Sequence, residues 1–110
     1  MAYIANLYVE AGATFTRTIT YTNPDGTLFN LDGYTAELQV RETVASATAD
    51  ITVNPTIDVE AATLTWTFTA AQTSALTASK YVYALELTHT NGTVIRLVEG
   101  DLTVSPEVVR

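Results

Sequence analysis

The sequence contains no cysteine, few basic residues and no long apolar run. Without cysteine, neither disulfides nor thiolate metal sites can form, so we expect a fold stabilised by its hydrophobic core. Five basic residues against twelve acidic ones give a net charge of −7, which disfavours binding to nucleic acid phosphates. No stretch approaches the roughly 18 consecutive apolar residues of a membrane span, so we expect no membrane insertion.

The length and the N-terminal residues suggest a simple organisation. A chain of 110 residues suits one domain, over 1–110, with one hydrophobic core. Residues 1–6 lack the basic region and the long apolar segment of a secretory signal. We therefore expect synthesis and retention in a cytoplasm.

What the sequence does contain is an alternation of polar and apolar residues. Threonines at every second position from 14 to 22 alternate with residues that include Phe15 and Ile19, and threonines from 63 to 69 alternate with Leu64, Trp66 and Phe68. A period of two is typical of half-buried antiparallel strands, and threonine suits their solvated face. We expect strands at residues 7–9, 14–22, 34–41, 51–53, 64–68, 81–89 and 93–104.

Short turns separate these strands. Asn91-Gly92 is a strong hairpin signal, and the proline and glycine of residues 23–26 also favour a turn. Residues 70–76 have helical propensity over one or two turns, which suggests a crossover between sheets. Seven or eight strands at this spacing predict an all-β protein, an immunoglobulin-like antiparallel β-sandwich, with a small closed barrel as the alternative.

The sequence offers little catalytic or metal-binding chemistry. His89, the only histidine, lies beside the hairpin turn without a nucleophile motif, so we interpret it as a strand-end residue. Two acidic pairs at alternate positions, Asp58 with Glu60 and Glu99 with Asp101, lack the dense oxygen ligands of a calcium site. We therefore predict no enzyme activity, no cofactor and no metal site.

Arg17 is an unusual residue for its position, because it falls in the same row as Phe15, Ile19 and Tyr21. That row predicts a side chain that points toward the core or a covered sheet edge. A buried guanidinium would need a partner such as Glu37 or Glu86. The alternative is a bulge at Gly12, or a side chain that reaches solvent at the rim of the sandwich.

Several short motifs match a pattern found in tailed bacteriophages. They include Leu7 with Val9, Gly12-Ala13-Thr14-Phe15, Asp25-Gly26, Leu31-Asp32-Gly33-Tyr34, Leu38-Gln39-Val40-Arg41, Tyr81, Tyr83 with Leu85-Glu86-Leu87, Asn91-Gly92-Thr93, Glu99-Gly100 and Val104-Ser105-Pro106-Glu107-Val108. Through them the chain resembles the small immunoglobulin-like domain at the N-terminus of phage upper baseplate proteins and related short virion proteins. The resemblance spans almost the whole chain.

The resemblance implies a non-enzymatic structural protein of the virion, assembled in the host cytoplasm. Such a protein would dock on the tail or baseplate as an accessory module, in several copies, with other virion proteins as its partners. One alternative is head decoration, as a capsid cement protein. Another is a carbohydrate-binding module for host adsorption, since the chain has six tyrosines besides Trp66. A hydrolase is a third and weaker alternative.

The N-terminal residues provide the candidate interface. Residues 1–6 include an apolar segment that could act as an interaction arm by adding a strand to a neighbouring sheet. The alternative is that they extend the edge of the protein's own sheet. The candidate interface residues are Tyr3, Ile4, Leu7 and Tyr8.

Overall fold

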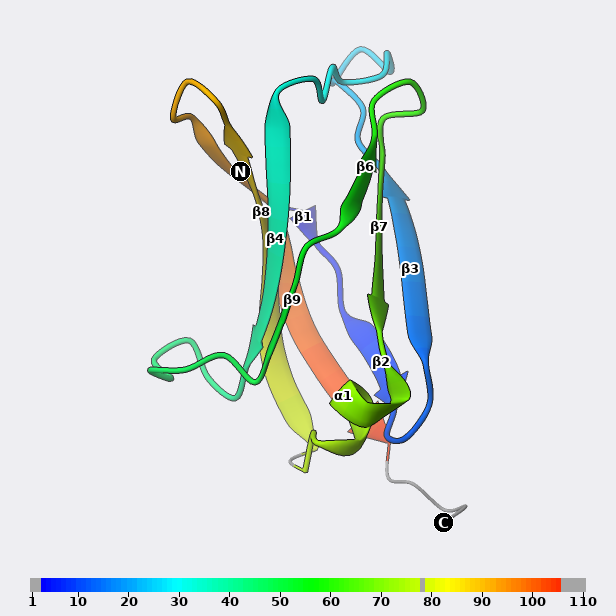
Figure 1. Ribbon diagram of the computed structural model, residues 1–110, viewed down its shortest axis with the longest axis vertical. Helices are drawn as coiled ribbons and strands as arrows, with labels where there is room; N and C mark the ends of the chain where they lie inside the picture. The colour runs from blue at the N-terminus through cyan, green and yellow to red at the C-terminus, as the bar shows by residue number, and fades with distance from the viewer. Residues whose placement is uncertain (1–2, 78, 106–110) are drawn as a thin grey trace.

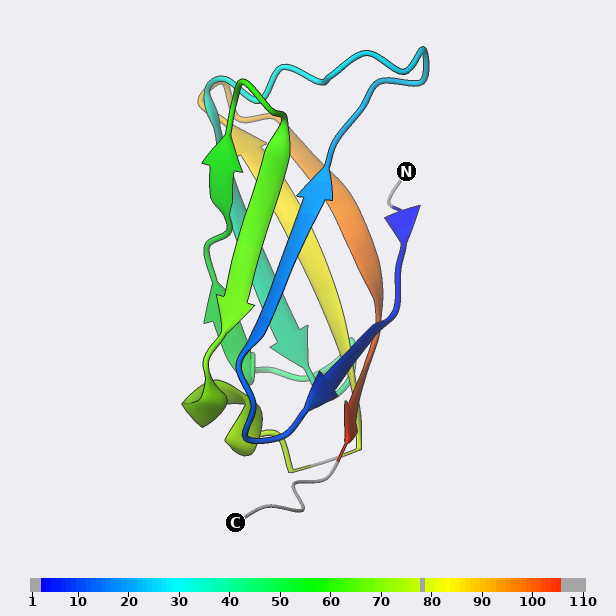
Figure 2. The ribbon, with the colours of Figure 1, turned by 90° about the vertical axis from the view of Figure 1, so that its right-hand side faces the viewer.

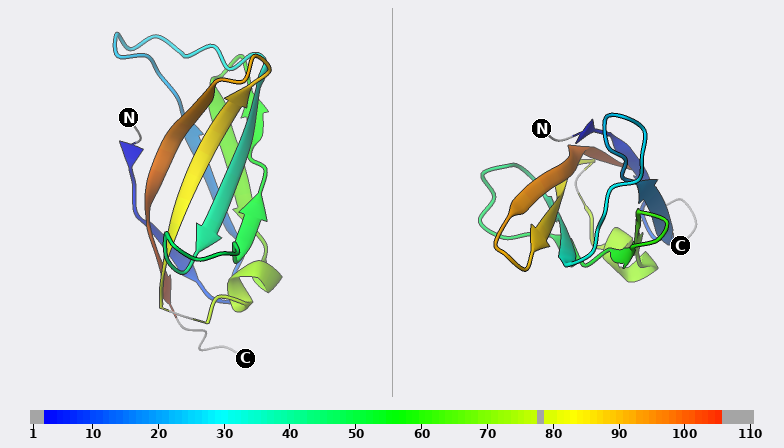
Figure 3. Two further views of the ribbon diagram at one scale, coloured as in Figure 1. Left: turned by 90° about the vertical axis from the view of Figure 1, so that its left-hand side faces the viewer. Right: turned by 90° about the horizontal axis from the view of Figure 1, so that it is seen from above.

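The computed structural model describes residues 3–77 and 79–105, which form two β-sheets packed face to face (Figure 1). The first sheet has the strand order β1-β9-β8-β4-β5, and β2 also pairs with β9. The second sheet has the order β3-β7-β6. Figure 3 shows the two layers from above and the face of the first sheet from the side. The predicted all-β sandwich is confirmed.

The elements follow one another as short strands with one helix. Their bounds are β1 Tyr3–Ile4, β2 Leu7–Glu10, β3 Phe15–Thr20, β4 Tyr34–Arg41, β5 Ile51–Val53, β6 Thr56–Asp58, β7 Thr63–Phe68, α1 Ala70–Ser74, β8 Lys80–His89 and β9 Val94–Ser105. The described residues thus form nine strands, and the sequence did not predict β1 or β6. β1 has only two residues, and β6 has a single apolar residue, Ile57, so neither shows the repeated alternation that β5 shows at Ile51 and Val53.

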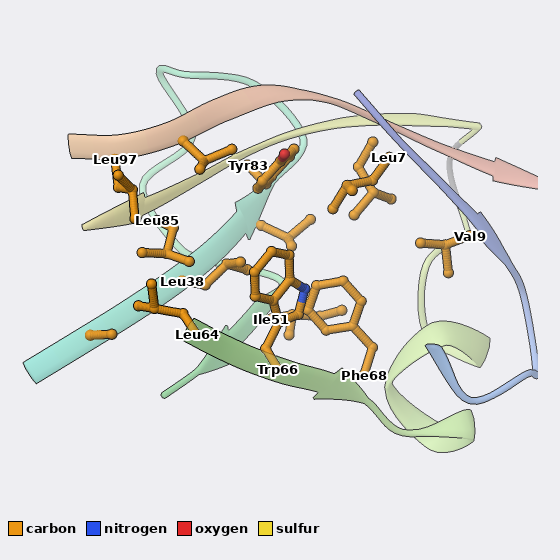
Figure 4. Close-up of a cluster of buried hydrophobic side chains, with 14 of the residues drawn as sticks. Leu7, Val9, Leu38, Ile51, Leu64, Trp66, Phe68, Tyr83, Leu85 and Leu97 are labelled. Carbon is orange, nitrogen blue, oxygen red and sulfur yellow. The ribbon is translucent and has the colours of Figure 1, made fainter. Parts of the chain in front are cut away.

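The core lies between the sheets and is built by the inward rows of the strands. In β4, Ala36, Leu38 and Val40 are buried, as their alternation predicted. Trp66 in β7 is 3% exposed and faces the first sheet (Figure 4). Its indole nitrogen is buried and has no hydrogen-bond partner among the described residues. The predicted inward position of Trp66 is confirmed.

The β8–β9 hairpin closes through the predicted Asn-Gly turn. Gly92 has a φ of 95°, a left-handed conformation that favours glycine. The Asn91 side chain accepts a hydrogen bond from the Thr93 amide at 2.9 Å, and the His89 amide donates to the Thr93 carbonyl at 2.8 Å. The turn residues therefore fix the register of the two longest strands.

Helix α1 carries the chain from the second sheet to the first, as predicted. Thr69 and Gln72 cap its N-terminus reciprocally, each side chain bonding the other's main chain. The buried hydroxyl of Thr73 donates to the Ala13 carbonyl at 2.9 Å and accepts from the Gly12 amide at 3.0 Å. These bonds attach the turn between β2 and β3 to the helix.

We expect Trp66→Ala to lower the free energy of unfolding by about 3 to 5 kcal/mol, because it removes a large buried side chain and leaves a cavity. Denaturant melts measure the change. Tyr8→Ala is the control, since Tyr8 is 72% exposed. It should cost under about 1 kcal/mol, as surface substitutions usually do. An equally small loss for Trp66→Ala would contradict the inward packing of Trp66.

Candidate docking surface

Three exposed side chains of the N-terminal strands form the candidate docking surface. Tyr3 and Ile4 in β1 are 64% and 80% exposed, and Tyr8 in β2 is 72% exposed. Tyr3 and Ile4 are consecutive residues of one end strand, so their side chains lie on the two sides of this sheet edge. Large apolar side chains that remain open to solvent are typical of interaction surfaces. Figure 2 shows β1 and β2 along one edge of the sandwich.

Leu7 does not belong to this exposed surface, because its side chain is buried. The side chain is 2% exposed and lies in the core (Figure 4). The reason is the alternation of β2, in which Leu7 and Val9 face inward and Tyr8 faces solvent. The docking surface is therefore Tyr3, Ile4 and Tyr8.

The N-terminal segment pairs with the protein's own sheet, which is the alternative to an interaction arm. Tyr3 and Ile4 lie opposite Val98 and Glu99 of β9 in a parallel pairing, and the Ala5 amide donates to the Glu99 carbonyl at 2.9 Å. Of the predicted arm, residues 1 and 2 lie outside the described residues. The exposed side chains of the described part project from a strand that is already held in place.

A close main-chain crossing holds this segment against β9. A side chain at Gly100 would collide with the Ala5 carbonyl, so the crossing requires glycine. The Asp101 amide donates to the Asn6 side chain at 3.1 Å just beyond it. The hydroxyl of Tyr83, in β8, donates a hydrogen bond to the same Ala5 carbonyl. Contacts from β9 and β8 therefore hold the segment that carries the candidate docking surface.

We expect Gly100→Ala to displace residues 3–6 from β9, because its methyl group would occupy the place of the Ala5 carbonyl. The protein should lose about 1 to 3 kcal/mol of stability, the usual cost of overpacking. Hydrogen exchange at the Ala5 amide should become faster. Thr103→Ala, on the same strand, adds no atom and should leave that exchange unchanged. Full protection of Ala5 in the Gly100→Ala protein would show that the crossing is not tight.

A groove of about 290 Å³ lies beside the docking surface. β2 runs into β3 through the turn at residues 11–14, and the N-terminal strands and β3 diverge from that turn (Figure 2). Side chains of both sheets line the groove, most of them apolar. They include Tyr3, Leu7, Arg17, Ile19, Trp66 and Tyr83.

Arg17 lies at the rim of this groove, so the alternative interpretation of its position is the correct one. The residue is exposed, and its guanidinium carbon lies 5.4 Å from the centre of the Phe15 ring. This distance is within reach of a cation–π contact. The two acids considered as partners bond elsewhere, Glu86 with Arg96 and Glu37 with Gln39.

Tyr83 forms the floor of the groove. Burial raises the pKa of its phenol to about 12, and the positive charge of Arg17 partly offsets that rise. The folded protein therefore favours the neutral phenol, which donates to Ala5. The contribution of the neutral Tyr83 phenol to the free energy of unfolding is therefore fully present below the ordinary tyrosine pKa of about 10. It is lost as the pH rises toward about 12.

We expect Tyr83→Phe to cost about 1 kcal/mol at neutral pH, the usual value of one hydrogen bond. The variant should also lose less stability than the wild type between about pH 10 and 12, because it has no phenol to ionise. Denaturant melts across this range measure both effects. The control is Tyr8→Phe, whose exposed ring should leave the pH dependence unchanged. An identical alkaline profile for Tyr83→Phe would contradict the burial of this phenol.

The polar residues considered for chemistry make structural contacts. The Nδ1 atom of His89 accepts from the Asn91 amide at 3.2 Å, and its ring packs edge-on against Tyr34. Asp58 accepts from the Ala61 amide at 3.2 Å. Within residues 3–77 and 79–105, no three His, Asp or Glu side chains gather as a metal site.

The outer face of the first sheet carries a second hollow, of about 460 Å³. Its charges are largely paired, since Arg96 lies 3.4 Å from Glu86 and 3.9 Å from Glu99. Lys80 pairs with Asp101 at 3.4 Å. Exposed ion pairs of this kind contribute little to stability and keep the face well hydrated.

No protein-family model matches the sequence, and no curated protein matches it. Among the described residues, no helix has the length and apolar character to cross a membrane.

Proposed function

We propose that the protein is a non-enzymatic structural component of a tailed-phage virion, which docks on the tail or baseplate as an accessory module. The docking surface of Tyr3, Ile4 and Tyr8 makes the contact. Other virion proteins are its partners, and several copies join the particle.

The observation that carries this proposal is the apolar surface held on a fixed strand. A side chain on an ordered strand loses less conformational freedom on binding than one on a free arm. β1 is held through the Ala5 amide and carbonyl, so Tyr3 and Ile4 are presented in place. The resemblance in the turn and strand motifs supports the assignment to a phage particle.

Head decoration and sugar binding are the alternatives to tail docking. Head decoration would use the same surface on a different partner. Sugar binding would use Tyr3 and Tyr8, whose rings are exposed enough to stack on a pyranose. Trp66 is buried and does not take part in that alternative.

We expect mass spectrometry of purified particles to find the protein at fixed stoichiometry, and cryo-electron microscopy to place it on the tail or baseplate. Ile4→Ser should reduce incorporation about tenfold or more, because burial of an isoleucine is worth about 1.5 to 3 kcal/mol. The control is Val59→Ser, which changes an exposed aliphatic side chain in the β6–β7 turn of the other sheet.

Each alternative has its own outcome in this experiment. Density on the capsid with the same dependence on Ile4 would favour head decoration. Glycan binding that is lost in Tyr3→Ala and Tyr8→Ala would favour the sugar-binding module. Particles that contain none of the protein would refute the proposal.

A further inference from the structure

Two sheet ends face each other across the groove. β3 is the end strand of the second sheet and hydrogen-bonds to β7 along one side only. β1 is the end strand of the first sheet and pairs only with β9. An end strand presents unpaired N–H and C=O groups, to which an extended peptide can add.

The size and lining of the groove favour peptide side chains. Its volume of about 290 Å³ is at the lower limit of sites that enclose a whole small molecule, which are roughly 300 to 1,000 Å³. Its walls combine Ile19 of β3 with Leu97 and Val98 of β9. Apolar walls of this size suit one or two aliphatic side chains of an extended segment.

Two residues that line this groove, Trp66 and Arg17, carry hydrogen-bond donors with no acceptor among the described residues. Trp66 is 97% buried, since 3% of it is exposed, and its indole N–H has no partner there. Leaving a buried donor unpaired is costly, so this part of the core is less stable than a fully bonded one.

The second donor is Arg17, whose charge is not balanced by a carboxylate. The other described basic residues are engaged: Arg41 donates to the Ser46 carbonyl, Lys80 pairs with Asp101, and Arg96 pairs with two glutamates. The guanidinium of Arg17 contacts the Phe15 ring and lines the groove. In a chain of net charge −7, it is a local site for a negative group.

We infer that the groove receives an extended segment of a partner protein, which adds as a strand to β3 and places an acidic side chain on Arg17. Alternate aliphatic side chains of the segment enter between the sheets, beside Trp66. This inference rests on the proposed docking function and names the chemistry of the partner. A second copy of the chain is disfavoured, because two chains that each carry a net charge of −7 repel each other.

The experiment starts with a displayed library of short linear peptides, selected on the immobilised protein. We expect the enriched peptides to alternate aliphatic and polar residues around one aspartate or glutamate. The peptides are then synthesised, and their binding is measured by the fluorescence of Trp66, the sole tryptophan. Binding should shift the emission, because the indole lines the groove.

Matched variants test the charge pairing. Arg17→Met should weaken binding about 10- to 100-fold, the range for a hydrogen bond between charged groups, and Arg17→Lys should retain part of the affinity. Replacing the peptide's acid by its amide should weaken binding equally, and the two changes together should cost little more than either one. Arg96→Met is the control, with the same charge change on the opposite face of the first sheet.

Three results would overturn the inference. The first is enrichment of no peptide, or only of peptides without an acid. The second is equal binding to the wild type and to folded Arg17→Met protein. The third is self-association of the wild-type protein in sedimentation experiments, if that association is lost in Arg17→Met. This result would place a second copy of the chain in the groove. Peptide binding by a protein absent from virions would refute only the proposed function, whereas normal virion incorporation without peptide binding would refute only this inference.

Discussion

The pairing of β9 on both of its sides is the constraint on which the rest of the structure depends. One side pairs antiparallel with β8, and the other pairs in parallel with β1 and β2. The N-terminal strands bond to β9 and not to β3, so β3 remains at the end of its own sheet. The groove opens between β3 and the N-terminal strands. Gly100 permits this arrangement, since a larger residue would push Ala5 away from β9.

The two outer faces of the sandwich are polar and bonded within themselves. On the second sheet, Thr16 pairs with Thr67 and Thr18 with Thr65 through their hydroxyls, at 3.1 and 2.9 Å. On the first sheet, Arg96 links two glutamates. These faces can stay in water at little cost, whereas the N-terminal edge exposes apolar surface. The proposed docking through that edge would bury exposed apolar surface of Tyr3, Ile4 and Tyr8.

The alternation along the chain predicted most of the fold. It placed Leu38 and Trp66 in the core and the threonines on the outer face, because successive side chains of a strand point to opposite sides. The Asn91-Gly92 turn and the capped helix after β7 were also recognisable, since both depend on residues close in sequence. The same alternation could have shown that Leu7 and Tyr8 face opposite ways, yet both were assigned to the interface.

The sequence by itself determined seven of the nine strands, the main turns and most of the residues that face inward, because these properties depend on local geometry and on a period of two. Only the tertiary structure decided that β1 and β2 bond to β9, that Arg17 lies at a rim and that a groove separates two sheet ends. Those features depend on contacts between segments that are far apart in the sequence. The hydrogen bond between Asn6 and Asp101, for example, joins residues 95 positions apart. An alternating pattern specifies the faces of a strand but not its neighbour.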